Sequence, residues 1–84
     1  MYAVEFTSAA ARQVRKLPRP AQVRVLGAIE LLGTDPRLPG ARKLAGEATA
    51  WRMRVGEYRV IYDVFDRSLI VTVVRVGHRR EVYR

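Results

Sequence analysis

Residues 51–65 read WRMRVGEYRVIYDVF, and the alternation within this stretch decides the fold. Side chains alternate between apolar and polar on both sides of Gly56-Glu57, which predicts two strands, 51–55 and 58–65, joined by a two-residue turn. Glycine in the first position of such a turn is typical of type II′. The stretch therefore predicts an antiparallel hairpin with a defined register.

The register of this hairpin predicts one face that is rich in arginine. Arg54 lies directly opposite Arg59, and Arg52 lies beside Ile61 on the same face. Like charges across a ladder are destabilising, so this pair favours an anion bound between the two guanidiniums. The alternative is a solvent-exposed face on which the two side chains point apart. The opposite face pairs Val55 with Tyr58, Met53 with Val60 and Trp51 with Tyr62.

The N-terminal part of the chain predicts a strand over 2–6 and then two helices that form a hairpin. The first helix begins after the capping residue Thr7 and is stopped by Pro18, and the second covers 20–33 with Gly33 as its C-cap. Their apolar stripes consist of Ala10, Val14 and Leu17 in the first helix and Val25, Ile29 and Leu32 in the second.

Two further segments complete the predicted fold. Residues 34–50 are rich in Pro, Gly and Ala, which predicts a long surface loop. Residues 69–76 read LIVTVVRV and predict a central strand that is covered on both faces. We therefore expect one α+β domain over 1–84 with the order β-α-α-β-β-β, in which an N-terminal strand and a helical hairpin pack on a twisted, mainly antiparallel sheet.

Composition limits the function. The chain has 84 residues, of which 49% are hydrophobic, and this is enough for one modest core. It contains no cysteine and no apolar run of the roughly 18 residues that cross a bilayer, so we expect a cytoplasmic protein without a membrane partner. Its 16 Lys and Arg residues outnumber 8 Asp and Glu, and the net charge of +8 indicates nucleic acid as the first partner to consider. The alternative is a solvated basic surface or one that meets an acidic protein.

The end of the chain adds two groups that can transfer protons. An antiparallel return of the last strand brings 77–84, GHRREVYR, beside Arg54 and Arg59. This segment contains His78, Arg79, Arg80 and Tyr83.

Guanidiniums with a nearby imidazole and phenol suit the cleavage of RNA without a metal or cofactor. The ribose 2′-hydroxyl is the nucleophile, so the protein needs cations for the pentavalent phosphorus, a base and an acid. Because the pKa of arginine lies above about 12, we expect Tyr83 or His78 to transfer the proton. Taken alone, His78 is better explained as a surface histidine and Tyr83 as a packing residue. Candidates for further substrate contacts are Arg42, Lys43 and Arg80.

Three motifs resemble the RelE/ParE toxin superfamily: KLAG at 43–46, WRMRVGEYRVIYDV at 51–64 and VRVGHRREVYR at 74–84. In the RelE branch, such a toxin enters the ribosomal A site and cleaves mRNA through the 2′-hydroxyl, using basic residues on the sheet and a tyrosine near the C-terminus. By position in the motifs, the resemblance gives these roles to Arg52, Arg54, Arg59, Arg79 and Tyr83.

The resemblance leaves two branches open, because in the ParE branch the same fold binds DNA gyrase and cuts no RNA. Three positions depart from the best-known RelE pattern. Arg52 and Arg54 stand where lysines are typical, and Ala45 stands where that pattern has another arginine. We expect an mRNA interferase that acts on ribosomes, with the gyrase inhibitor as the alternative. Either branch implies a small cognate antitoxin, bound against the helical hairpin, the sheet edge or the basic face.

Overall fold

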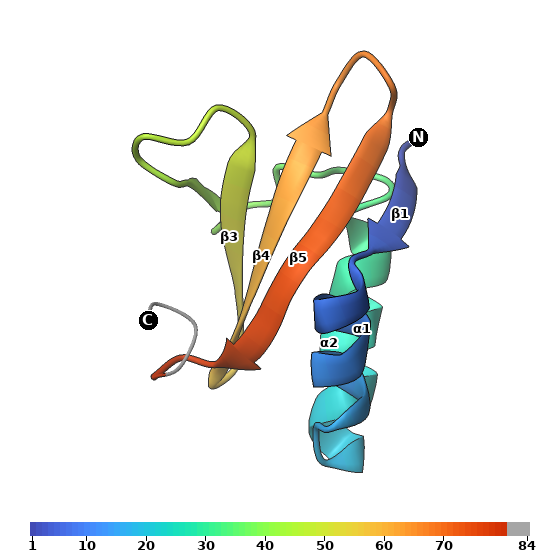
Figure 1. Ribbon diagram of the computed structural model, residues 1–84, viewed down its shortest axis with the longest axis vertical. Coiled ribbons are helices and arrows are strands. Elements are labelled where there is room, and N and C mark those ends of the chain that lie inside the picture. Colours follow the sequence, from blue (N-terminus) through green and yellow to red (C-terminus); the bar gives the residue numbers. More distant parts are fainter. Residues whose placement is uncertain (81–84) are drawn as a thin grey trace.

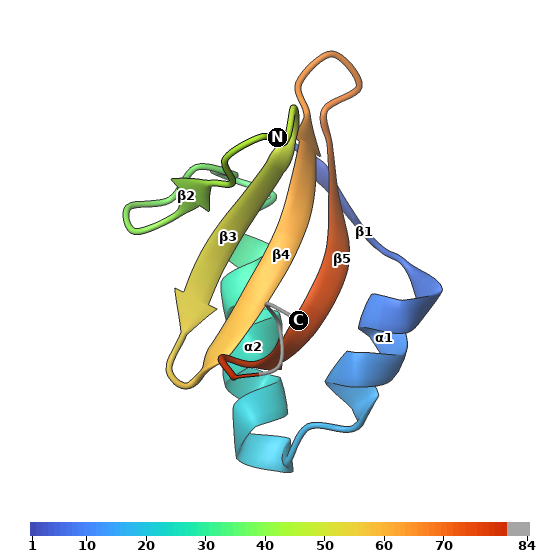
Figure 2. The ribbon, with the colours of Figure 1, turned by 60° about the vertical axis from the view of Figure 1, so that its left-hand side comes forward.

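The computed structural model describes residues 1–80, in which two helices cover one face of a twisted five-stranded sheet (Figures 1 and 2). The elements in chain order are β1 (Ala3–Phe6), α1 (Ser8–Arg15), α2 (Arg19–Leu31), β2 (Arg42–Lys43), β3 (Ala50–Val55), β4 (Tyr58–Phe65) and β5 (Ile70–His78). The predicted α+β class and the helical hairpin packed on a mainly antiparallel sheet are confirmed.

The strands lie in the order β1-β5-β4-β3-β2, and all neighbours are antiparallel except β1 and β5. The prediction of a plain loop over 34–50 was wrong in one respect, because Arg42 and Lys43 pair with β3 as a short edge strand. A strand of two residues has no alternation that a sequence pattern can detect. The sheet therefore extends one strand beyond the predicted hairpin.

The β3–β4 hairpin has the predicted register. Arg54 pairs with Arg59, Arg52 with Ile61, and Trp51 with Tyr62. Gly56 has a φ of +58° whereas Glu57 keeps a negative φ, as a type II′ turn requires. A side chain on Gly56 would also collide with the Arg24 guanidinium of α2, since an added Cβ would lie 2.3 Å from its Nη2 atom.

A bulge in β5 changes which side chains face the helices. The β4–β5 register shifts between Ile61 and Tyr62, so that Ile61 pairs with Arg75 and Tyr62 with Val73. Val71 and Val73 are buried, and without the bulge the next residue on that face would be Arg75. The extra residue turns Arg75 outward, and Val76 is buried in its place.

The first helix covers the edge of β5 beyond the end of β1. The hydroxyl of Thr7 accepts a hydrogen bond from Ala10 N at 3.1 Å, as an N-cap does, and donates to the Val74 carbonyl at 3.3 Å. The side-chain oxygen of Gln13 accepts from Val76 N at 2.7 Å. Two side chains of this segment thus satisfy backbone groups that no strand pairs.

The core lies between the helices and the inner face of β3, β4 and β5. Its largest fully buried side chains are Tyr62, Ile29, Leu32, Val25, Val60, Val71 and Val73. The expectation that both faces of the last strand are covered was wrong, because Ile70, Thr72 and Val74 are only half-buried and both helices lie on the other side.

The second helix ends differently from the prediction. It stops at Leu31, and Gly33 does not have the positive φ of a left-handed C-cap. Glycine suits the close approach of two chain segments there, since an added Cβ would lie only 3.1 Å from the Tyr2 carbonyl oxygen. Among the described residues, no helix has the length and apolar character needed to cross a membrane.

Candidate nucleic-acid interface

The outer face of the sheet, away from the helices, collects five arginines in two rows. Pairing across the strands aligns Arg42, Arg52, Ile61 and Arg75 in one row and Arg54, Arg59 and Gly77 in the next. Paired residues point to the same side of a sheet. We call the resulting surface the arginine face; it consists of Arg42, Arg52, Arg54, Arg59 and Arg75.

The arginine face is hollowed beside β3. The hollow has a volume of about 280 Å³ and is lined by Pro39, Gly40, Arg42, Arg52, Met53 and Arg54. Three of these residues carry guanidiniums, which bind phosphate oxygens in a bidentate manner. The hollow therefore suits an anion better than an apolar ligand.

Arg79 lies at the tip of the β3–β4 hairpin, next to the arginine face. Its backbone N–H donates to the Glu57 carbonyl at 2.9 Å, and its Nε lies 3.3 Å from the Glu57 carboxylate. Both side chains are about half-exposed. The four arginines to which the sequence gives a catalytic role thus come from β3, β4 and the segment that follows β5.

The structure separates His78 from the arginine face. His78 pairs with Tyr58, whose ring packs against the core on the inner side of the sheet, and the two ring centroids lie 6.0 Å apart in an edge contact. The imidazole Nδ1 accepts from Arg80 N at 3.3 Å, and Nε2 lies 4.0 Å from the Glu57 carboxylate. Tyr83, the other candidate for proton transfer, lies outside the described residues.

The remaining predicted contacts divide between the two sides of the sheet. Lys43 pairs with Trp51 and so points to the side opposite Arg42, where its ammonium donates to the Glu47 carbonyl. Arg80 is exposed beyond the end of β5. Sequence reasoning missed Arg75, because an unbulged strand would place it on the inner face.

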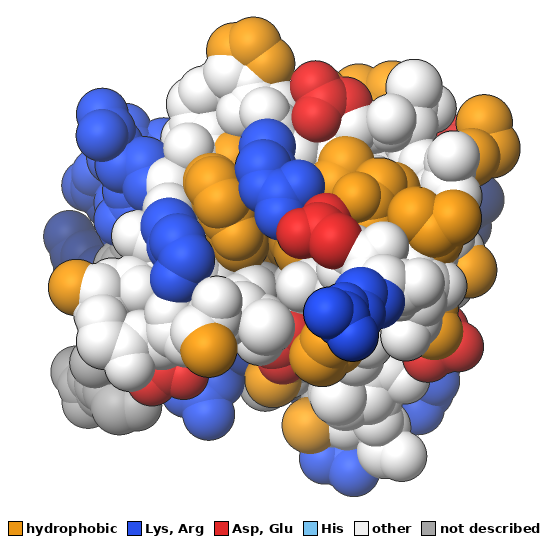
Figure 3. Space-filling model, turned by 90° about the horizontal axis from the view of Figure 1, so that it is seen from above, with side chains coloured by type: hydrophobic (Ala, Val, Ile, Leu, Met, Phe, Trp, Pro, Cys, Tyr) orange, Lys and Arg blue, Asp and Glu red, His pale blue; other side chains and the backbone are white. Residues whose placement is uncertain are grey.

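The opposite end of the sheet holds a cluster of linked side chains around Asp66. The Arg37 guanidinium donates to Asp66 at 2.8 Å and the Tyr2 hydroxyl at 2.6 Å, and together they hold the pKa of Asp66 below its usual value. The Arg37 guanidinium carbon also lies 5.4 Å from the centroid of the Trp51 ring. Figure 3 looks onto this end, where acidic, basic and hydrophobic side chains are mixed.

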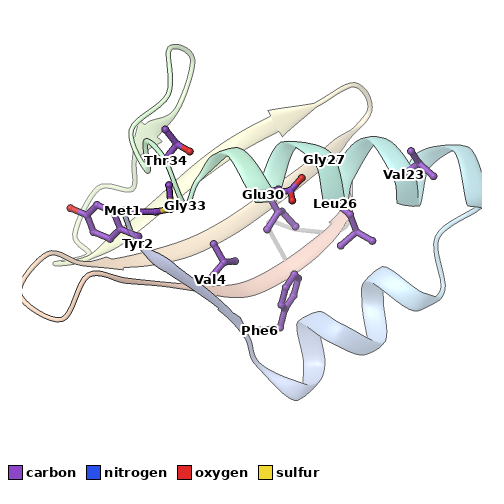
Figure 4. Close-up of a pocket in the computed structure, with 11 residues that line it drawn as sticks. Met1, Tyr2, Val4, Phe6, Val23, Leu26, Gly27, Glu30, Gly33 and Thr34 are labelled. Atoms are coloured by element: carbon purple, nitrogen blue, oxygen red, sulfur yellow. The ribbon is translucent and has the colours of Figure 1, made fainter.

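An apolar groove runs between β1 and α2, at the edge of the sheet opposite β2. Its volume is about 840 Å³. Figure 4 shows Val4 and Phe6 of β1 facing Leu26 of α2, with Glu30 nearby. Val23, Leu26 and Phe6 are among the exposed large hydrophobic residues of this surface. Contiguous exposed apolar surfaces are typical of sites that bind another macromolecule.

Comparison with known proteins gives one matching family model and similar toxins. Residues 4–83 match the model described as the ParE toxin of the type II toxin-antitoxin system parDE. The chain is 36% identical to Toxin RelG of Mycobacterium tuberculosis, over 99% of this chain and 97% of that protein.

Solved structures of RelE have the same fold. The isolated Escherichia coli RelE toxin aligns with a TM-score of 0.83 at 28% identity, covering 99% of this chain and 92% of that one. The toxin in the intact E. coli RelBE toxin–antitoxin complex aligns with a TM-score of 0.82 at 25% identity, covering 93% and 96%.

Proposed function

This chain belongs to the RelE/ParE superfamily of type II toxins, and on that premise we propose that it acts in the cytoplasm as a ribosome-dependent mRNA interferase. The observation that carries the proposal is the pairing of Arg54 with Arg59 on the arginine face. Two guanidiniums directly across the ladder concentrate positive charge at one point of the sheet, and a phosphodiester is an anion that such groups bind well.

The arginine face gives the proposed substrate a path over several strands. Phosphates of a single strand can contact the row of Arg42, Arg52 and Arg75 and the adjacent row of Arg54 and Arg59. Arg42 lies in β2, so the short edge strand widens the surface beyond the hairpin. It adds a cation to a chain that has Ala45 where the RelE pattern has arginine.

The proposed reaction uses the RNA as its own nucleophile. The ribose 2′-oxygen forms a bond to the adjacent phosphorus, and the bond from phosphorus to the 5′-oxygen breaks. This leaves a 2′,3′-cyclic phosphate and a 5′-hydroxyl. The 2′-hydroxyl loses one proton and the 5′-oxygen gains one, so the proton count balances. Arg52, Arg54, Arg59 and Arg79 would stabilise the added negative charge on phosphorus.

We assign the proton transfer to Tyr83 in preference to His78. His78 lies on the Tyr58 side of the sheet, away from the Arg54–Arg59 pair. The assignment of Tyr83 rests on the resemblance of the C-terminal motif.

A second candidate function is inhibition of DNA gyrase, because the matching family model is described as the ParE toxin. In that case the chain binds a protein and cuts no RNA. The deciding experiment is induction in bacteria, followed by mapping of mRNA 5′ ends against ribosome position. In-frame cuts within translated codons support the interferase. Intact mRNA together with altered plasmid supercoiling supports the gyrase inhibitor.

We also propose that the apolar groove between β1 and α2 binds a cognate antitoxin. Relatives of this fold have been solved in toxin–antitoxin complexes. The groove presents exposed apolar side chains of β1 and α2, on a chain whose net charge is +8. An amphipathic antitoxin segment would bury these side chains.

The groove can be tested with two leucines of the same helix. Leu26 lines the groove and is 41% exposed, whereas Leu31 is 55% exposed and lies outside the groove. We expect Leu26→Glu to abolish co-purification with the antitoxin, because burying a carboxylate in an apolar contact is costly. Leu31→Glu should bind as the parent does. Equal retention of the antitoxin by both variants would contradict the assignment of the groove.

A further inference from the structure

Glu57 is an acid among cations at the turn of the β3–β4 hairpin, which we call the hairpin end. Of the described residues 54–59 and 77–80, it alone is acidic. It accepts the Arg79 backbone N–H at 2.9 Å through its carbonyl, and its carboxylate lies 3.3 Å from Arg79 Nε and 4.0 Å from His78 Nε2. One turn residue thus holds both the backbone and the side chain of Arg79.

Neither folding stability nor substrate affinity explains why a glutamate occupies position 57. The carboxylate is 63% exposed and the Arg79 side chain 53%, and an ion pair so open to solvent contributes little to stability. A carboxylate beside a basic surface also weakens the attraction of that surface for a polyanion. The remaining consequence of the contact is the orientation of the guanidinium.

The geometry of the ion pair leaves Arg79 ready to bind an anion. The carboxylate contacts Nε, the guanidinium nitrogen nearest to the main chain. The two Nη groups also form an edge of the guanidinium that does not include Nε, and this edge can bind two oxygens of one phosphate. A long arginine side chain has many rotamers, and the contact with Glu57 restricts them before the substrate arrives.

We infer that Glu57 is a positioning residue that orients Arg79 for RNA cleavage and, through the contact with His78, holds the end of β5 beside it; this role rests on the proposed function. The Nδ1 of His78 is held by Arg80 N, so Glu57 and Arg80 approach the imidazole from its two nitrogens. Glu57 touches no reacting atom and acts only through its partners.

The test uses Glu57→Gln with Glu5→Gln as its matched control. Both variants remove one negative charge from an exposed side chain, and Glu5 lies in the distant edge strand β1. Purified toxin is assayed on programmed ribosomes for cleavage rate and for affinity. We expect Glu57→Gln to slow cleavage by up to about a hundredfold, as a misplaced group does, while its affinity stays equal to that of the parent or rises. Glu5→Gln should cleave as fast as the parent.

A double-mutant cycle shows whether the effect passes through Arg79. If Glu57 acts by orienting that guanidinium, Glu57→Gln has no further effect on cleavage in an Arg79→Ala background. Additive effects of the two changes would overturn the inference. So would unchanged cleavage by Glu57→Gln, or the same change in Glu5→Gln, because then only net charge matters.

A measurement without RNA separates this inference from the proposed function. The ¹⁵N relaxation of the Arg79 Nε–H group, identified by comparison with Arg79→Lys, should show restricted motion in the parent and free motion in Glu57→Gln. If the parent cleaves no mRNA but the relaxation changes as expected, the proposed function fails and the positioning of Arg79 stands. If Arg79 moves freely in the parent, the positioning role is wrong whatever the RNA result.

Discussion

Arginine side chains have opposite surroundings at the two ends of β4. At the end near Phe65, Arg37 meets the Asp66 carboxylate and the Trp51 ring, and the Tyr2 hydroxyl binds the same carboxylate. At the end near Tyr58, Arg54 and Arg59 face each other across the ladder. The first arrangement uses arginine to join segments that are far apart in the sequence, and the second gathers positive charge.

The difference teaches that the number of arginines does not locate a binding surface. With 14 arginines in 84 residues, almost every part of the chain is basic. What distinguishes the hairpin end is the ratio of cations to acids on one face. If this difference is functional, changes at the Arg37 end should alter stability alone and changes at the hairpin end should alter cleavage alone.

The largest expected effect is that of Tyr83→Phe on cleavage. The change keeps the ring but removes the hydroxyl, so we expect a loss of roughly 10²- to 10⁴-fold, as is usual for a general acid or base. Ribosome affinity and thermal stability should stay as in the parent. The measurement is single-turnover cleavage on programmed ribosomes. If Tyr83→Phe cleaves as fast as the parent while His78→Ala does not, the proton transfer belongs to His78.

The next effect concerns folding stability, which the comparison assigns to the Arg37 end of β4. Tyr62 is fully buried and donates to the Pro36 carbonyl at 2.7 Å, and burial raises its pKa to about 12. We expect Tyr62→Ala to lower the free energy of unfolding by about 3–5 kcal/mol, and Tyr62→Phe by about 1 kcal/mol. Urea denaturation measures both. A stable Tyr62→Phe variant that no longer cleaves would break the division between the two ends.

A smaller effect is expected in the salt dependence of binding at the hairpin end. Each phosphate contact with a single strand contributes about 0.7 to the slope of log affinity against log salt concentration. Arg54→Ala should make that slope shallower by this amount, and Arg67→Ala, a change in an exposed arginine of the turn at the other end of β4, should leave it unchanged. Binding of the parent that does not respond to salt would contradict an RNA interface and favour a gyrase contact.

The smallest effect is that of Asp66→Asn, and it depends on pH. Hydrogen bonds from Arg37 and Tyr2 lower the pKa of Asp66 in the folded state. A lowered folded-state pKa stabilises the protein above the unfolded-state value of about 3.9, and this stabilisation is lost as the pH falls through the folded value. The Tm difference between parent and variant should therefore be present at neutral pH and disappear in strong acid. A difference that persists in acid would mean that the charge of Asp66 is irrelevant.

Local patterns predicted the hairpin, including the register that pairs Arg54 with Arg59. Alternation and one glycine were sufficient there, because the interacting residues are close in the sequence. Local patterns could not predict the parallel pairing of β1 with β5, or the contact between Tyr2 and Asp66, which are 64 residues apart. Such long-range contacts depend on how the elements pack.

The candidate site was predicted only in part, for a related reason. Arg52, Arg54 and Arg59 follow from the hairpin register, whereas Arg75 reaches the arginine face through a bulge that leaves no signal in the sequence. The separation of His78 from these arginines follows from its pairing with Tyr58, at the far end of a bulged strand. The role inferred for Glu57 needed distances, because a glutamate in a turn is ordinary in composition.

The bulge in β5 also determines which change in length this strand can accept. Val73 and Arg75 pair with Tyr62 and Ile61, which are consecutive in β4, so Val74 is the one residue of β5 that the ladder leaves unpaired. Deleting Val74 would give a regular strand in which Val73 and Val76 still face the core and the Arg75 guanidinium still lies on the arginine face. Engineered libraries and homologous chains should therefore tolerate the loss of this one residue.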